Sequence, residues 1–122
     1  MGRMSKIIGN YGEDMAVEHL QSLGYKIIER NFRSHHGEID IIAEDGEVLV
    51  FVEVKNYSYR SLGAPQSSIR KGKRESIIHA ARSYLHMMRI QDKFCRFDVL
   101  TVFREEGNRK RVELIKDAFR LS

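Results

Sequence analysis

The chain has 122 residues, 42% of them hydrophobic and 31% charged, and it carries a net charge of +4 with a pI of about 9.3. We expect one globular domain over residues 1–122, without a signal peptide and without the ~20-residue apolar run of a membrane-spanning helix. The single cysteine excludes an intramolecular disulfide and fits a reducing cytoplasm, and the mild basic excess permits nucleic-acid binding without requiring it.

A first helix is predicted over Tyr11–Leu23, because its apolar residues recur at i, i+4 and i+7. Asn10 is placed to cap this helix, with Glu13 three residues later in a capping-box arrangement, and Gly24 is a stop signal. Glu13 also lies on the apolar stripe and therefore points inward. Two interpretations stay open: Glu13 caps the helix, or it directs a carboxylate toward the sheet.

A first strand is predicted over Tyr25–Phe32, and a polar connection over Asn31–His36. The adjacent His35 and His36 point apart on an extended chain, and no matching Cys or His spacing exists elsewhere in the sequence. We interpret this pair as part of an exposed loop rather than as metal ligands.

The next segment predicts a β-hairpin. Ile39–Ala43 and Val48–Val54 are rich in β-branched residues, and Asp45-Gly46 between them is a strong signal for a two-residue turn. With this turn as the loop, Glu44 pairs with Glu47.

The predicted register gathers charged side chains on one face of the hairpin. Glu38 is expected opposite Glu53, and Asp40 and Lys55 project from the same face because side chains alternate with period two. Crowded carboxylates need a cation, and hard oxygen ligands suit Mg²⁺ or Mn²⁺. A salt-bridge network is the structural alternative, and both stay open. The opposite face is expected to be wholly apolar, with Ile39, Ile41, Ala43, Val48, Val50, Val52 and Val54.

The longest irregular stretch is predicted over Asn56–Gln66, next to the acidic face. Tyr57, Tyr59 and Arg60 could stack on bases and hold phosphates, or they could only cover the edge of the sheet. The sequence favours neither interpretation.

A second helix is predicted over Ser67–Met88. Arg70, Lys71, Lys73 and Arg74 place four cations in its first turns, where they oppose the helix dipole. Phosphate contact explains these cations, and a solvated basic face explains them equally. Lys73 lies on the apolar stripe, whose other members are Ile69, Ile77, Ala80, Ala81, Tyr84, Leu85 and Met88.

The C-terminal part predicts two strands. Phe94–Phe103 alternates as a buried strand, and Arg96 and Asp98 on its polar side are expected to form a structural pair. Glu105–Arg109 contains Gly-Asn and predicts a turn, and Arg111–Ile115 predicts a short closing strand at an edge.

The order of helix, three strands, helix and two strands, with carboxylates on the second and third strands, resembles the PD-(D/E)XK nuclease superfamily. Its restriction-endonuclease-like fold is α/β, an αβββαβ core whose central mixed sheet is flanked by helices. From about Gly9 to Phe119 the chain also resembles the YraN-like family of small bacterial proteins, which is often described as similar to Holliday-junction resolvases. The motifs that carry this resemblance are Gly12-Glu13-Asp14-x-Ala16, Gly24-Tyr25, Arg30-Asn31-x-Arg33, Gly37-Glu38-Ile39-Asp40-Ile41-Ile42-Ala43, Phe51-Val52-Glu53-Val54-Lys55 and Arg96-Phe97-Asp98-Val99.

The resemblance implies roles for individual residues. Asp40 matches the motif aspartate, Glu53 the second acid and Lys55 the motif lysine, and Glu13 matches a glutamate supplied by the first helix. These four are the candidate catalytic residues. The residue before Asp40 is isoleucine instead of proline, and no superfamily role transfers to Glu38.

The implied activity is metal-dependent hydrolysis of phosphodiester bonds in DNA, including branched, Holliday-junction-like DNA, by a two-fold dimer. Asp40, Glu53 and the carbonyl of Val54 would hold one or two Mg²⁺ or Mn²⁺ ions, and Glu13 would complete the shell or orient a metal-bound water. A non-catalytic nucleic-acid-binding module with the same fold is the alternative, and a purely structural acid network with protein partners is the third. The candidate nucleic-acid-binding residues are Lys73, Arg74, Arg70 and Tyr57.

Overall fold

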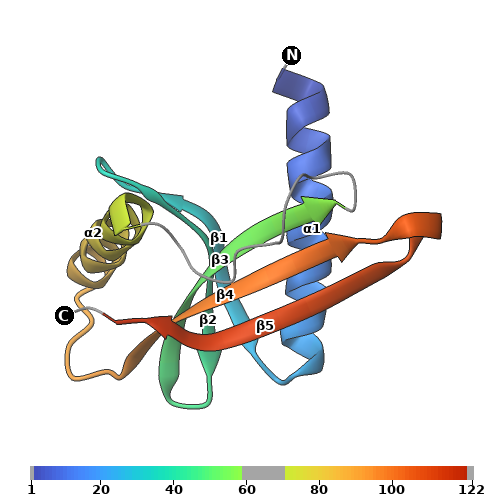
Figure 1. The fold of residues 1–122 in the computed structure, drawn as a ribbon. Helices are drawn as coiled ribbons and strands as arrows, with labels where there is room; N and C mark the ends of the chain where they lie inside the picture. The colour runs from blue at the N-terminus through green and yellow to red at the C-terminus, as the bar shows by residue number, and fades with distance from the viewer. Residues whose placement is uncertain (1, 59–70, 121–122) are drawn as a thin grey trace.

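Two helices and one five-stranded sheet make up the described part of the chain (Figure 1). The computed structural model describes residues 2–58 and 71–120. The elements are α1 (Gly2–Ser22), β1 (Lys26–Arg33), β2 (Glu38–Asp45), β3 (Val48–Ser58), α2 (Lys71–Met87), β4 (Cys95–Arg104), the 3₁₀ turn η1 (Glu106–Asn108) and β5 (Lys110–Phe119). No helix among the described residues is both long enough and apolar enough to cross a membrane.

The strands follow one another across the sheet in chain order, β1-β2-β3-β4-β5. Strands β3 and β4 are parallel, and the other three pairs are antiparallel. A parallel pair needs a crossover connection, and α2 lies on it. The predicted order of elements and the mixed α/β sheet are confirmed, and the arrangement is consistent with a restriction-endonuclease-like core.

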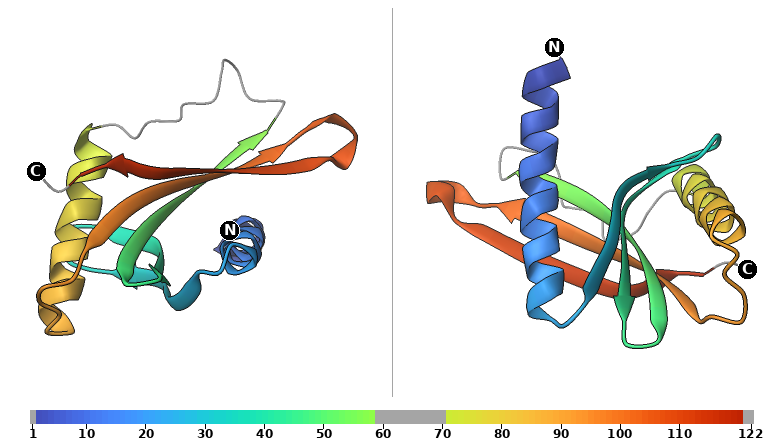
Figure 2. Two further views of the ribbon diagram at one scale, coloured as in Figure 1. Left: turned by 90° about the horizontal axis from the view of Figure 1, so that it is seen from below. Right: turned by 180° about the vertical axis from the view of Figure 1, so that it is seen from behind.

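Each helix covers its own face of the sheet, so the core has two layers (Figure 2). On the α1 side, Ala16 and Leu20 pack against alternate residues of the strands. On the α2 side, Tyr84 meets Phe32 and Phe51 edge to face, with ring centroids 5.2 and 6.1 Å apart. The strand residues of the first layer are Ile41, Ala43, Val50, Val52, Leu100 and Val102, and those of the second include Ile39, Ile42, Leu49, Phe51, Phe97 and Val99.

Helix α1 begins at Gly2, well before the predicted start at Tyr11. Asn10 therefore lies inside the helix, and its predicted role as an N-cap is wrong. The apolar spacing of the sequence continues upstream, and a capping-box signature inside such a stretch does not mark a boundary. The end of the helix is confirmed, because Ser22 is its last residue and Gly24 takes the left-handed φ of +92°.

The β2–β3 hairpin turns one residue later than predicted. Asp45 pairs with Val48, so the predicted pair of Glu44 with Glu47 is wrong. The loop begins at Gly46, whose φ of +62° suits the first position of a primed hairpin turn. A turn that moves by one residue shifts the pairing by two, and the paired core side chains from Ile41 to Val52 keep their predicted faces because the side-chain period is also two.

The shifted register changes which acid lies opposite Glu53. The ladder between β2 and β3 continues to the pair of Ile41 with Val52 and brings Asp40, in place of Glu38, beside Glu53. Beyond that pair, the Val54 N–H donates to Asp40 Oδ2 at 2.8 Å. A side chain thus takes the place of a backbone acceptor, and the regular pleat is interrupted at Asp40.

Ile39 does not join the apolar face that the alternation predicted. It lies in the layer under α2, where its pairing partner Phe32 also packs. The interruption at Asp40 explains this error, because period-two alternation holds only while the ladder is regular.

Strand β3 continues to Ser58, so the irregular stretch does not begin at Asn56 as predicted. Asn56 pairs with Val102 and Tyr57 with Phe103 on the parallel strand β4. The rest of the predicted loop, with Tyr59 and Arg60, lies outside the described residues.

The remaining boundaries differ by small amounts. The predicted helix residues 67–70, including Ile69 and Arg70, lie outside the described part of the chain, and Met88 follows α2 as an exposed residue rather than a member of its apolar stripe. The predicted turn at 105–109 is confirmed by η1, in which Gly107 takes a φ of +77°. Strand β5 extends beyond the predicted Ile115 to Phe119, with a left-handed Asp117 near its end.

Gly37 lets the β1–β2 connection touch α2, which predicts a cost for any larger residue. A Cβ at this position would lie 2.5 Å from the backbone oxygen of Ser76. We therefore expect Gly37→Ala to lower the free energy of unfolding by about 1–3 kcal/mol, measured by urea denaturation. Gly72→Ala is the matched control, because its Cβ would meet nothing within 4 Å. The control should be neutral or stabilising, and equal losses in the two variants would contradict the packing argument.

Candidate active site

Two carboxylates from neighbouring strands form the centre of the site. Asp40 lies on β2 and Glu53 on β3, within hydrogen-bonding reach of each other. The Val54 N–H fixes Asp40, and Nζ of Lys73 on α2 lies 3.6 Å from Glu53 Oε1. The structure thus brings together two of the four candidate catalytic residues, Asp40 and Glu53, and it places the predicted basic residue Lys73 beside them.

The two carboxylates do not easily carry two negative charges. Burial raises the pKa of Asp40, against the hydrogen bond from Val54 that lowers it. Burial, followed by the charge of Asp40, raises the pKa of Glu53 to about 8, and Lys73 only partly opposes the rise. At neutral pH the pair therefore favours a shared proton or a bound cation.

The oxygen atoms of this pair fit a hard divalent cation. Glu53 Oε2 is buried, and it has no hydrogen-bond partner among the described residues. The Glu53 side chain is only 13% exposed, so water does not easily take the place of that partner. A buried acceptor without a partner costs free energy, and a cation beside it would remove that cost. Within residues 2–58 and 71–120 no three Asp, Glu, His or Cys side chains are placed to hold a metal. Two carboxylates still suit Mg²⁺, which usually binds through one or two carboxylates and completes its shell with water and phosphate.

Glu13 enters from α1 and is 8% exposed. Arg30 Nε donates to Glu13 Oε1 at 3.3 Å, and the Asn31 side chain also hydrogen-bonds to it. Burial raises the pKa of Glu13 against the effect of Arg30, and the charge of Asp40 raises it further. The capping interpretation is wrong, because Glu13 lies deep inside α1. Its carboxylate is close enough to Asp40 to be affected by that charge, but its hydrogen bonds go to Arg30 and Asn31 and not to the central pair.

Arg30 is a residue of this site that the sequence analysis did not select as a candidate. Its guanidinium also donates to Asp14 Oδ1 at 2.7 Å, so one side chain of β1 holds two consecutive acids of α1. The only signal in the sequence is the Arg30-Asn31 motif, since no spacing rule connects a strand residue to a helix seventeen positions earlier.

Lys55 follows on β3, half-buried and on the same side as Glu53. Burial lowers the pKa of Lys55, and the charge of Glu53 opposes this. Tyr57, two residues on, meets the ring of Phe103 edge to face at 5.8 Å, so it packs on the sheet. Arg74 is exposed on α2, and Arg70 lies outside the described residues.

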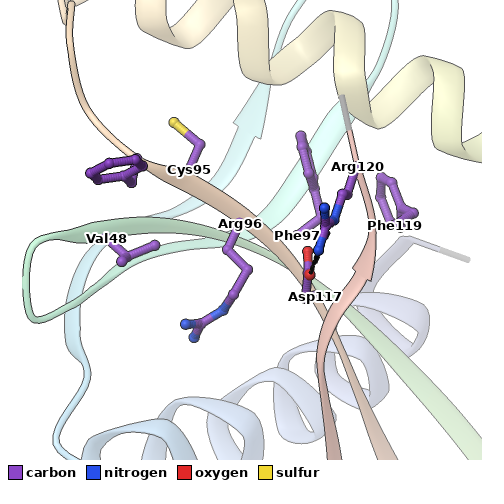
Figure 3. A pocket seen from close by; sticks show the side chains of 8 residues that line it. Val48, Cys95, Arg96, Phe97, Asp117, Phe119 and Arg120 are labelled. Atoms are coloured by element: carbon purple, nitrogen blue, oxygen red, sulfur yellow. Dashed lines mark hydrogen bonds and ion pairs between the residues drawn. The ribbon is translucent and has the colours of Figure 1, made fainter. Parts of the chain in front are cut away.

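A separate hollow of about 430 Å³ lies at the other end of β4 (Figure 3). Its cysteine, Cys95, pairs with Leu49, four positions along the ladder from Glu53 and so roughly 13 Å away. Burial raises the pKa of the Cys95 thiol, which is the opposite of what a nucleophilic cysteine needs. This hollow therefore adds nothing to the acidic site.

Arg96 and Asp98, next to that hollow, form the structural pair that the sequence predicted. Arg96 Nε lies 2.9 Å from Asp98 Oδ1, and Asp98 is fully buried. The Tyr25 hydroxyl donates to Asp98 Oδ2 at 3.1 Å, and the Asp117 N–H donates to Oδ1 at 3.0 Å. Arg96 also reaches Asp45 at 2.9 Å, so the network ties β4 to β5, to the hairpin and to the α1–β1 connection at Tyr25.

Comparison with known proteins identifies similar chains but no activity. The model of "Uncharacterised protein family UPF0102" matches residues 12–102. A UPF0102 protein of Clostridium perfringens is 41% identical over 122 residues, covering 99% of this chain and 100% of the relative. Those of Geotalea daltonii and Syntrophus aciditrophicus are 43% and 44% identical, over 97% and 93% of this chain and 93% and 89% of theirs. The matched segment contains Glu13, Asp40, Glu53 and Lys55.

Proposed function

The chain belongs to the uncharacterised protein family UPF0102, and from its site we propose that it is a metal-dependent nuclease that hydrolyses phosphodiester bonds in DNA. The observation that carries this proposal is the half-buried Asp40–Glu53 pair, in which one buried carboxylate oxygen of Glu53 has no partner among the described residues. A lysine 3.6 Å from the same carboxylate adds the positive charge that a phosphate substrate needs.

Asp40 and Glu53 would hold one or two Mg²⁺ or Mn²⁺ ions, together with the carbonyl of Val54. A divalent cation lowers the pKa of bound water and offsets charge that develops on the phosphate. The protein supplies a preorganised donor set, because the Val54 N–H fixes Asp40 and the pairing with Val99 of β4 fixes Glu53. The restriction-endonuclease-like fold and the motif resemblance support the same assignment.

Lysines and Glu13 complete the proposed chemistry. Lys55 would position the attacking water or offset charge on the reacting phosphate, as a compact ammonium can. Glu13, held by Arg30 at 3.3 Å, would orient a water on the α1 side of the pair. Lys73 and Arg74 would bind the DNA backbone with Arg70 and Tyr57, which makes the affinity strongly dependent on salt.

DNA as the substrate, the dimer and the location are parts of the same proposal. Branched DNA presents two symmetric cleavage points, and a two-fold dimer would meet both of them. A DNA substrate and a single free thiol both fit the reducing cytoplasm, where we place the protein.

A cleavage assay with end-labelled linear and four-way-junction DNA tests the function. We expect cleavage in Mg²⁺ or Mn²⁺, none in EDTA, and a loss on the order of 10³-fold in Asp40→Ala, since metal catalysis contributes several kcal/mol and 1.36 kcal/mol corresponds to tenfold. Glu18→Ala, which removes an exposed acid of α1, is the matched control and should cleave like the parent.

The same assay separates the alternatives. If the parent binds DNA but does not cleave it in Mg²⁺ or Mn²⁺, and if Asp40→Ala binds DNA with the same affinity, the protein is a non-catalytic binding module. A protein that neither binds DNA nor gains thermal stability from divalent cations would leave the acids with a structural role alone.

A further inference from the structure

A cleft of about 460 Å³ opens beside the acidic pair, between the β1–β2 connection and the start of α2. Its floor is the close contact of Gly37 with the α2 backbone at Ser76. It shares Lys73 with the candidate active site, while its other charged residues, Arg33 and Glu38, have no part in the mechanism proposed above.

The charges of this cleft are paired weakly. Arg33 and Glu38 are opposite one another on β1 and β2, and Arg33 Nε lies 3.2 Å from Glu38 Oε2. The Arg33 side chain is 78% exposed and that of Glu38 is 40% exposed, so water screens the pair. Exposed pairs of this kind contribute about 0–1 kcal/mol, whereas an arginine can bind a phosphate with two parallel hydrogen bonds. If a phosphate replaced Glu38 as the partner of Arg33, the exchange would therefore cost little free energy and would add a strong contact.

The position of the cleft fits a nucleic-acid strand that passes the acidic pair. Glu38 precedes Asp40 by two residues on the same strand, a separation of about 6.6 Å. Backbone phosphates recur about every 3.4 Å of rise along each DNA strand. A strand whose phosphate lay at Asp40 and Glu53 would carry its neighbours past Arg33.

We propose that this cleft is a second phosphate subsite, in which Arg33 and Lys73 hold a DNA backbone phosphate one or two nucleotides from the cleaved bond, and the phosphate displaces Glu38 from Arg33. This inference rests on the proposed nuclease function. It gives Glu38 a role that the superfamily motif does not: the carboxylate holds Arg33 in place without substrate and opposes phosphate binding.

Binding measured in EDTA tests the subsite without cleavage. The probe is a fluorescein-labelled DNA duplex, and the readout is the slope of log Kd against log salt concentration. We expect Arg33→Ala to reduce this slope by about 1, the value for one lost phosphate contact. Arg82→Ala is the matched control, an exposed arginine of α2 outside the cleft, and its slope should equal that of the parent.

Two further variants separate the specific contact from total charge. Arg33→Lys should recover the slope but only part of the affinity, because an ammonium cannot make the two parallel hydrogen bonds. Glu38→Gln should tighten binding several-fold in the parent and less in the Arg33→Ala background, since its competition for Arg33 is then absent.

The possible failures are distinguishable. Equal slopes for Arg33→Ala and Arg82→Ala, with DNA cleavage intact, would overturn the subsite and leave the nuclease proposal standing. An equal effect of Glu38→Gln in both backgrounds would overturn the displacement of Glu38. Absence of DNA binding by the parent would overturn the subsite together with the proposed function. Thermal melting curves of each variant check that it folds, and we expect little change for these substitutions at exposed or half-exposed positions.

Discussion

Replacing Glu53 by glutamine should abolish DNA cleavage and, without divalent cations, stabilise the fold. Cleavage should fall on the order of 10³-fold, because the amide is a poor ligand for a hard cation. Stability should rise on the order of 2 kcal/mol at pH 8, because the variant no longer buries an ionised carboxylate whose pKa is raised to about 8. Thermal melting in EDTA and the cleavage assay measure the two effects on one sample.

The stability effect has a defined pH dependence. The pKa of Glu53 rises from 4.5 to about 8 on folding, so between these values the folded protein binds more protons than the unfolded chain. The contribution of Glu53 to stability is therefore greatest at low pH and is lost as the pH rises through 8. The difference between Glu53→Gln and the parent should widen over this range.

Divalent cations should reverse the order of stability of Glu53→Gln and the parent. Mg²⁺ or Mn²⁺ should raise the melting temperature of the parent and not that of Glu53→Gln, since a ligand stabilises the state that binds it. Glu47→Gln, which changes an exposed acid of the same hairpin, is the control. It should match the parent in DNA cleavage and in melting temperature, with and without divalent cations. A destabilised, metal-responsive Glu53→Gln would show that Glu53 is not the cation ligand.

Removing Asp98 should cause the largest loss of stability among the substitutions considered. Asp98 is fully buried and accepts hydrogen bonds from Arg96, Tyr25 and the Asp117 backbone. Asp98→Ala would leave Arg96, whose side chain is 18% exposed, with a partly buried charge and fewer acceptors. We expect a loss of about 3–5 kcal/mol by urea denaturation.

Two variants keep this prediction testable if Asp98→Ala does not fold. Asp98→Asn retains an acceptor oxygen and should lose less than the alanine variant. Asp14→Ala breaks the 2.7 Å pair with Arg30 at a side chain that is 60% exposed, and it should cost no more than about 1 kcal/mol. Losses of similar size for Asp14 and Asp98 would contradict the importance of burial.

The sequence predicted the order of the elements and the convergence of Asp40 and Glu53, although the hairpin register was wrong by two. Period-two alternation explains this success, because Asp40 and Glu53 keep their face under a shift of two residues. Which acid lies opposite Glu53 depended on the turn, where Gly46 and not Asp45 begins the loop.

Features that depend on contacts between distant segments were not predictable. The contact of Arg30 with Glu13 forms only when α1 packs against the sheet, and the contact of Lys73 with Glu53 forms only when α2 does. Ile39 lies in the α2 layer because the Asp40 side chain interrupts the regular alternation of β2. Periodicity placed Glu13 and Lys73 on the inward faces of their helices, but it could not identify the residues that they meet there.

The position of Lys73 gives the proposed enzyme a form of cooperativity. The ammonium group of Lys73 lies 3.6 Å from Glu53 Oε1 and also lines the neighbouring cleft. A nucleic acid that drew this ammonium away would leave the acid pair more negative and so more attractive to a cation. By thermodynamic reciprocity a bound cation would release the ammonium for the incoming backbone, so each ligand would favour arrival of the other.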